Sequence, residues 1–356
     1  MTQNRTQATR RRLLRAGAGT VIGLSALSGV TAQEGNEQEF EATYAEVYEE
    51  TIDDVVLVNV LGGEDEPPGG VGSGFVVDDH VVTNEHVVQN ATDVEIQFRD
   101  EQWRAGEVVG TDVYSDLAVL EVEDLPDAVD GLEFAADQPA IGQEVLAMGN
   151  PLGLDASLSQ GIVSGLDRSL LSPTGFSIPA AIQTDAPVDP GNSGGPLVTL
   201  ESDVVGVVFA GAGRTVGFAI SAQLADRVVP ALADDGEYDH AYMGVGVDPV
   251  GALIAEVNDL EDPQGVLIVD VTDDAPADGV LEPADDVEII DGVAVPTGGD
   301  VVVALDGEEI PNQDQLSSYL ALETSPGDDL EVEVRRDGDS QTLELALEER
   351  PETDLA

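Results

Sequence analysis

Cysteine and lysine are both absent from the 356-residue chain, and aromatic residues make up only 4% of it. Without cysteine the chain can form no disulfide, no thiolate nucleophile and no zinc–thiolate site. All 13 basic side chains are therefore arginines, and five of them precede residue 33. From residue 33 onward the 72 acidic residues face eight arginines. A basic footprint for nucleic acid is missing, so we expect no nucleic-acid partner.

The acidic residues are spread along both halves of the chain, and no Asp-x-Asp-x-Asp-Gly run with a later Glu marks a calcium loop. This distribution indicates a solvated surface adapted to very high salt. At about 1 M salt the screening length is roughly 3 Å, so repulsion among the acids is largely quenched. We therefore expect the protein to lose structure in dilute buffer. Circular dichroism in multimolar and dilute NaCl tests this expectation, and an unchanged spectrum would contradict it.

The first 32 residues have the features of an export signal. Arg10-Arg11-Arg12 is followed by two leucines, which resembles a twin-arginine (Tat) signal. A weakly apolar stretch then runs to Ala32, where a cleavage site is plausible. A retained membrane anchor is the alternative, but 17 weakly apolar residues are marginal for spanning ~30 Å of hydrocarbon. We expect a mature protein that starts near Gln33 and works outside the membrane or at the cell surface.

Short β-like runs separated by turn residues follow, and they predict a mainly β protein. A helix is expected from residue 40 to about 53, and a second at 221–233 closes the first domain, 33–233. A polar linker at 234–240 leads to a small α+β domain at 241–350, which has one helix, 314–322. The strands expected are 55–61, 74–77, 81–83, 94–98, 117–122, 144–148, 204–209, 216–220, 266–271, 301–305, 330–335 and 343–347.

A serine stands in the run Gly191-Asn192-Ser193-Gly194-Gly195-Pro196, between apolar segments. A serine hydroxyl is a poor nucleophile, so it must be exposed at a tight turn beside a base. Flanking glycines let the backbone turn so that its N–H groups form an oxyanion hole, here from Gly191 and Ser193. A glycine-rich surface turn is the alternative, and the partner residues make it less favoured.

The chain has only three histidines from which a general base can be drawn. His80 follows two aspartates in an expected hairpin turn, and His240 lies in the linker. His86 comes directly after an apolar strand, so it is the base that we predict.

A carboxylate must orient the base. Asp116 precedes the apolar run Leu117–Leu120, which draws it toward the interior, where an unpaired carboxylate is costly. Asp112 and Glu85 are less favoured choices. Glu85 is adjacent to His86 in the chain and badly placed to reach the far ring nitrogen.

The order His86, Asp116, Ser193 is that of chymotrypsin rather than of subtilisin or the α/β-hydrolases. At this point the sequence resembles the HtrA (Deg) family closely. The resemblance implies two six-stranded β-barrels with the triad in the cleft between them, and no metal or organic cofactor. It rests on the stretches 72–75, 83–88, 115–120, 149–153, 184–195 and 217–220, which run in family order.

The second domain is similar to the PDZ domain of HtrA proteases. Such a domain binds a peptide C-terminus as an added strand, with backbone amides holding the carboxylate. The resemblance assigns that carboxylate loop to Met243, Gly244, Val245 and Gly246. An insertion at 280–299 is longer than the usual turn and could shift or cover the groove. A β domain that only packs on the protease is the alternative.

The resemblance implies an ATP-independent endopeptidase for unfolded or damaged exported proteins, cleaving after small or medium aliphatic residues. A peptide-binding chaperone with latent or minor proteolysis is the alternative. The family resemblance also implies a homotrimer assembled through the N-terminal segment, with Phe40, Tyr44 and Tyr48 as contact residues.

Overall fold

The computed structural model describes residues 35–61, 70–89, 91, 93–150, 157–173, 175–209 and 216–351. The predicted export signal lies outside these residues. In the part of the chain that is described, no helix combines the length and apolar character needed to cross a bilayer.

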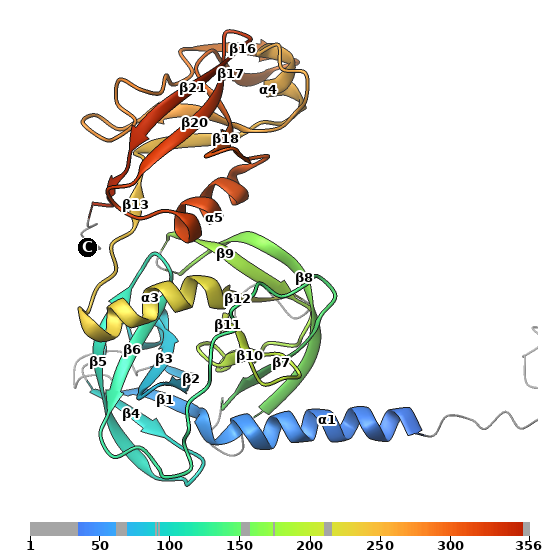
Figure 1. Cartoon of the computed structure of the whole chain (residues 1–356), viewed down its shortest axis with the longest axis vertical. Coiled ribbons are helices and arrows are strands. Elements are labelled where there is room, and N and C mark those ends of the chain that lie inside the picture. The colour runs from blue at the N-terminus through green and yellow to red at the C-terminus, as the bar shows by residue number, and fades with distance from the viewer. Residues whose placement is uncertain are drawn as a thin grey trace, which may run out of the picture. The chain divides into compact units, whose positions relative to one another are not determined.

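The first barrel is built from six antiparallel strands in the closed order β1-β2-β3-β6-β5-β4 (Figure 1). Its strands are β1 (Val55–Leu61), β2 (Val71–Val77), β3 (His80–Asn84), β4 (Asp93–Gln97), β5 (Trp103–Asp112) and β6 (Leu117–Val122). The predicted strand at 117–122 has the bounds of β6. The sequence did not predict β5, most of whose side chains are exposed or half-buried.

The second barrel is closed in the order β10-β11-β12-β9-β8-β7. Its strands are β7 (Glu144–Gly149), β8 (Ser157–Leu171), β9 (Ser177–Thr184), β10 (Pro196–Val198), β11 (Val204–Phe209) and β12 (Gly217–Ser221). The sequence predicted β7, β11 and β12 but not the long β8, which is rich in Ser and Gly. The double barrel expected from the family resemblance is therefore confirmed.

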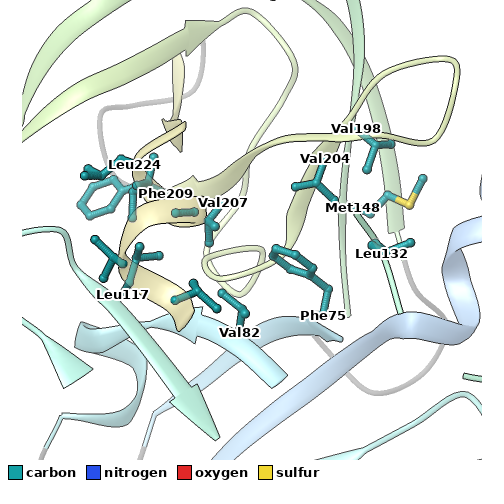
Figure 2. Close-up of a cluster of buried hydrophobic side chains, with 14 of the residues drawn as sticks. Phe75, Val82, Leu117, Leu132, Met148, Val198, Val204, Val207, Phe209 and Leu224 are labelled. Carbon is teal, nitrogen blue, oxygen red and sulfur yellow. The ribbon is translucent and has the colours of Figure 1, made fainter. Parts of the chain in front are cut away.

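Three apolar clusters explain why many of these strands have uninterrupted apolar sequences. In β6, Leu117 and Val119 face the layer between the barrels, whereas Ala118 and Leu120 fill the first barrel. Strands of the second barrel alternate in the same way, since their other face fills that barrel. Because side chains alternate along a strand, a strand buried on both faces must be apolar throughout. Figure 2 shows the shared layer, with Phe75 and Met148 among its largest side chains.

Two helices complete the protease part. Helix α3 (Ala222–Asp234) contacts β6 and β11, so it spans both barrels, and Ser221 caps its N-terminus by accepting a hydrogen bond from Leu224 N. Helix α1 (Gly35–Thr51) is longer than predicted. Its Tyr44 donates to Glu144 Oε1 at 2.6 Å, and Tyr48 packs against the core of the same chain. The trimer contact through this segment stays a prediction.

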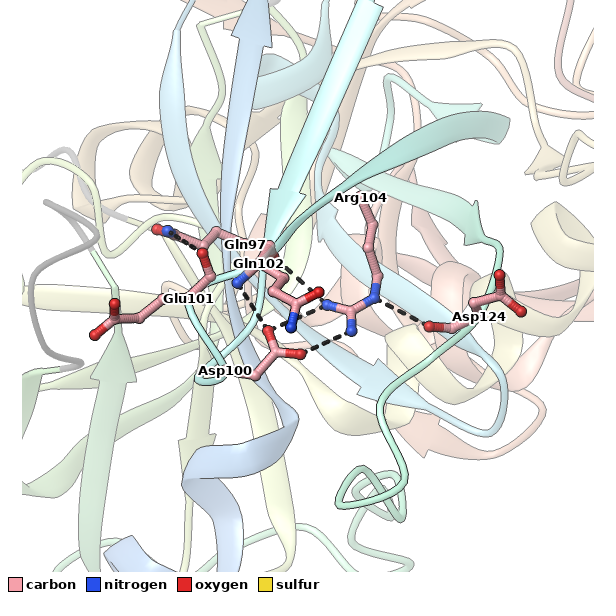
Figure 3. A network of polar contacts seen from close by, with 6 residues as sticks. All are labelled: Gln97, Asp100, Glu101, Gln102, Arg104 and Asp124. Atoms are coloured by element: carbon pink, nitrogen blue, oxygen red, sulfur yellow. Dashed lines mark hydrogen bonds and ion pairs between the residues drawn. The ribbon is translucent and has the colours of Figure 1, made fainter.

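Arginine is scarce from residue 33 onward, and Arg104 is used to fix a turn of the first barrel (Figure 3). Its guanidinium donates to both carboxylate oxygens of Asp100, at 2.8 and 3.2 Å, and to Asp124 O at 3.0 Å. It also lies 4.9 Å from the centre of the Phe98 ring. The bidentate bond from Arg104 lowers the pKa of Asp100. One cation thus fixes the β4–β5 connection.

The second domain is a sheet of order β14-β15-β18-β20-β21, with β19 beside β18 and the helices α4 (Ala252–Val257) and α5 (Gln313–Glu323). Its strands are β13 (Ala241–Tyr242), β14 (Val245–Pro249), β15 (Val266–Val271), β16 (Asp286–Ile290), β17 (Val293–Thr297), β18 (Val301–Leu305), β19 (Glu308–Glu309), β20 (Asp329–Arg336), β21 (Asp339–Ala346) and β22 (Glu348–Glu349). The predicted strands 266–271 and 301–305 have the bounds of β15 and β18.

The insertion noticed in the sequence forms a separate hairpin of β16 and β17. It is joined to the residue that follows α4, because Asn258 donates to Pro296 O at 3.3 Å and accepts from Gly298 N at 2.9 Å. Just after the hairpin in the chain, the buried Asp300 accepts a bidentate hydrogen bond from Arg336, with both distances 2.6 Å. The insertion is thus anchored on the α4 side of the domain.

Candidate active site

His86 and Asp116 are brought together by the pairing of two strands. Asn84, the last residue of β3, lies opposite Leu117, the first residue of β6. His86 follows in the short helix α2 (Glu85–Val88), and Asp116 immediately precedes β6. The Nδ1 atom of His86 lies 2.7 Å from Asp116 Oδ2, and the backbone N of His86 donates to Asp116 Oδ1 at 2.9 Å. Both oxygens of the predicted carboxylate therefore hold the predicted base.

Hydrogen bonds hold Asp116 by its backbone carbonyl as well as by its side chain. The residue is completely buried and has the left-handed φ of 56°. Its carbonyl accepts from Glu85 N at 3.0 Å and from Asn84 Nδ2 at 3.1 Å. Burial raises the pKa of Asp116, and the bonds and charge of His86 oppose that rise. A carboxylate fixed at ring atom Nδ1 leaves the other ring nitrogen, Nε2, for a different partner.

Ser193 lies on a loop between β9 and β10 that is held by its own turns. Asn192 N donates to Asp189 O and Gly195 N donates to Asn192 O, each at 3.0 Å. Gly191 has a φ of 102°, and with Pro190 before it this gives the second and third residues of a type II turn. Ser193 itself is 6% exposed.

The serine loop is anchored on the first barrel by Ser73 of β2. Ser73 Oγ donates to Gly191 O at 2.6 Å, and Ser73 N donates to Ser193 O at 2.8 Å. The same hydroxyl accepts from Asn150 N at 2.8 Å. This role of Ser73 was not predicted from the sequence, although the residue lies in one of the stretches that carry the family resemblance.

Gly194 brings the serine loop against the strand that leads to His86. A Cβ atom at Gly194 would lie 2.2 Å from both Ser73 O and Thr83 Oγ1, and 3.1 Å from Asn84 N. Since His86 follows Asn84 by two residues, this contact places the serine loop beside the His86 segment. The three predicted residues thus come from both barrels and lie at the junction between them.

Replacing Gly194 with Ala should therefore destabilise the protein by about 3 kcal/mol, because the clash adds to the cost of a φ of 85°. The matched control is Gly142→Ala, where φ is 91° and no atom lies within 4 Å of the added Cβ. That control should cost only about 1 kcal/mol. Denaturant unfolding of both variants in multimolar NaCl measures the difference, and equal losses would refute the close approach.

The two less favoured carboxylates have other surroundings. Asp112 is bonded to His240, with 2.8 Å between Oδ2 and Nε2, and not to His86. Glu85 is only 6% exposed, and its Oε2 has no hydrogen-bond partner among the described residues. Burial, together with the charge of Asp116, raises the pKa of Glu85 to about 7.

Glu85 should make stability fall as pH rises. Its ordinary pKa is 4.5 and its folded value is about 7, so the folded state binds the proton more tightly. Stability from this group is full below pH 4.5 and is lost as pH rises through 7. Relative to Glu85→Gln, wild type should lose at most about 3 kcal/mol between pH 5 and pH 8. Denaturant unfolding at both pH values measures this loss, with the exposed Glu121→Gln as control, and parallel pH profiles would contradict it.

Metal binding has no obvious location in the described residues, where no group of three or more His, Asp and Glu side chains could hold an ion.

The predicted carboxylate loop lies at the start of the second domain. Met243 is buried, and Gly244 has a φ of 79°. Strand β14 follows and pairs only with β15 in the described sheet, so its outer edge is free. Helix α5 contacts this strand.

This combination defines a trypsin-like double-barrel protein that carries a PDZ domain. The family model of the trypsin-like peptidase domain matches residues 72–207, and that of the PDZ domain matches residues 241–347. The chain belongs to the HtrA family.

Several relatives resemble the chain over most of its length. A protein of Marinomonas sp. named "Probable periplasmic serine endoprotease DegP-like" is 35% identical over 303 residues, 81% of this chain and 60% of that one. "Protease Do-like 1, chloroplastic" of Arabidopsis thaliana is 32% identical, with 81% and 65% covered. The chain thus spans about three fifths of these relatives. The solved structure "HtrA-type protease AlgW with tripeptide" is 27% identical with a TM-score of 0.68, and the match covers 87% and 98%.

Proposed function

We propose that the protein is an exported serine endopeptidase in which Ser193 is the nucleophile, His86 the base and Asp116 the orienting carboxylate. The observation that carries the proposal is the pair of hydrogen bonds between His86 and the carboxylate of Asp116, at 2.7 and 2.9 Å. It fixes the imidazole so that Nδ1 donates to Asp116 and Nε2 can accept a proton. The placement of Gly194 beside the His86 segment supports the same roles.

The chemistry follows from these positions. The Oγ atom of Ser193 attacks a peptide carbonyl while His86 takes its proton, and the N–H groups of Gly191 and Ser193 stabilise the oxyanion. His86 then protonates the leaving amine, and water hydrolyses the acyl-enzyme with His86 again as base. The turn at 189–192 and its anchor on Ser73 support a preformed oxyanion hole, since both fix Gly191.

Unfolded or damaged proteins outside the cytoplasm are the substrates that we propose. The relatives named as periplasmic endoproteases support export, and the Tat-like N-terminus suggests the route. Val188 supports a preference for aliphatic residues, because it packs with the cluster inside the second barrel and next to Gly217. Asp189 is exposed, as expected of surface charge.

The second domain is proposed to bind peptide C-termini. A peptide can add to the free edge of β14, with its carboxylate held by the backbone of Met243–Gly246. Gly244 supports this geometry, because a Cβ there would lie 2.2 Å from Ala275 Cβ and its φ is positive.

A fluorophosphate probe tests the proposed nucleophile without a substrate. Diisopropyl fluorophosphate should form a phosphoryl ester on Ser193 Oγ, with fluoride leaving and the hydroxyl proton passing to His86. Mass spectrometry of the folded protein in multimolar NaCl should find the adduct on the peptide that contains Ser193, and should find none after unfolding. A folded protein that stays unlabelled, or is labelled elsewhere, would contradict the assignment.

A further inference from the structure

A second histidine–aspartate pair lies next to the proposed triad, and the proposed mechanism does not use it. His240 Nε2 is 2.8 Å from Asp112 Oδ2, and the side chains are 10% and 5% exposed. His240 lies in the segment between α3 and β13, 128 residues along the chain from Asp112. A buried charge that persists in a fold must be paired and hydrogen-bonded, and Asp112 meets both conditions.

Asp112 organises the turn that presents Asp116. Its carboxylate accepts from Tyr114 N at 3.2 Å, from Ser115 N at 3.0 Å and from Ser115 Oγ. Ser115 is completely buried and directly precedes Asp116, whose φ of 56° requires an over-determined backbone. Asp112 also lies opposite Leu117 in the β5–β6 ladder. The turn from β5 to β6 is therefore closed around one carboxylate.

His240 is itself fixed on several sides. The rings of Tyr114 and Tyr238 meet its imidazole edge-on, at centroid distances of 5.4 and 4.8 Å. Its carbonyl accepts from Arg350 N at 2.8 Å, and the guanidinium of Arg350 lies 4.0 Å from the centre of the Tyr114 ring. Arg227 donates to the Tyr238 hydroxyl at 3.2 Å. An imidazole held in this way can impose its position on Asp112.

The charges agree with this arrangement. Burial acts to raise the pKa of Asp112, but the hydrogen bond and charge of His240 and the bonds from Ser115 and Tyr114 bring it below its ordinary value. The carboxylate therefore stays ionised and keeps its acceptor role toward the turn.

We propose that His240 is a positioning residue for catalysis, which through Asp112 and Ser115 holds Asp116 in the orientation that His86 requires. The inference rests on the proposed peptidase function. Small displacements of catalytic groups are costly, and misplacement by about 1 Å can lower rates up to 10²-fold. Because His240 follows the protease part in the chain, the residue also makes the triad depend on the segment that leads into the PDZ domain.

A matched pair of amide variants tests the proposal in the full-length chain. The amide nitrogen of Gln reaches about as far as Nε2 of histidine, whereas that of Asn does not. His240→Asn should lower kcat about tenfold with KM within about twofold, and His240→Gln should restore kcat to within about threefold of wild type. His80→Asn, at the start of β3, is the control and should leave both constants unchanged. Equal kcat for the two His240 variants, or a change in KM alone, would overturn the proposal.

Nuclear magnetic resonance gives a reading that does not need activity. The chain has only three histidines, so the low-field proton of the His86 Nδ1–Asp116 bond can be assigned. Its resonance should shift or broaden in His240→Asn and stay as in wild type in His240→Gln and His80→Asn. An unchanged resonance in folded His240→Asn would refute the positioning role. Absence of Ser193-dependent cleavage with this pattern intact would instead refute only the proposed peptidase function.

Discussion

Cleavage of casein in multimolar NaCl should be abolished by Ser193→Ala, with kcat reduced by a factor on the order of 10⁶. The reason is that the remaining site keeps its oxyanion donors and its base but has no atom that can form the acyl-enzyme. The expected loss far exceeds any effect of a change in packing, because Ser193 is small and Ala fits its place. Product formation is followed by gel electrophoresis, and sequencing of the products should show aliphatic residues before the cut.

The matched control for this experiment is Ser202→Ala, which changes a half-buried serine in the connection between β10 and β11. That variant should cleave casein at the wild-type rate. Casein cleaved equally fast by Ser193→Ala would refute the nucleophile. Folded wild type that prevents aggregation of casein but cleaves none would favour the peptide-binding chaperone.

The strands that could be predicted best from the sequence are those buried on both faces. Strands β1, β6 and β11 have the bounds expected from the sequence, because most of their positions on both faces are buried and each strand begins and ends with an apolar residue. Strand β8 was missed because two of its buried positions are glycines, Gly161 and Gly165, and polar residues separate its apolar ones, so no apolar run marks it. Strand β10 has only three residues, too few to show a pattern.

Some residues of the candidate site could likewise be predicted from the sequence, and others could not. His86 and Asp116 could be chosen because each stands at the end of an apolar strand, and the pairing of β3 with β6 puts those ends together. Asp112 and His240 could not be paired from the sequence, since 128 residues separate them and the chain offers many carboxylates. Ser73 was missed as an anchor because its role depends on where the serine loop folds back.

Because Asp116 orients His86 in the proposed mechanism, we expect its replacement to cause a second large loss of activity. Asp116→Asn should lower kcat about 10⁴-fold, since an amide can donate to His86 Nδ1 and so favours the tautomer whose Nε2 carries the proton. That imidazole cannot accept the proton of Ser193. The amide also lacks the negative charge that stabilises the imidazolium formed in the reaction.

The control is Asp54→Asn, because Asp54 is another buried aspartate of the first barrel that accepts from backbone N–H groups, those of Asp130 and Gly131. This variant should reduce the free energy of unfolding and leave kcat within about threefold of wild type. Steady-state cleavage of a peptide from the casein digest, with unfolding curves for both variants in the same salt, separates catalysis from stability. A folded Asp116→Asn that keeps a tenth or more of wild-type kcat would show that another carboxylate orients His86. Asp112 is held by His240 and the carboxyl of Glu85 has a pKa near 7, so neither is suited to replace it.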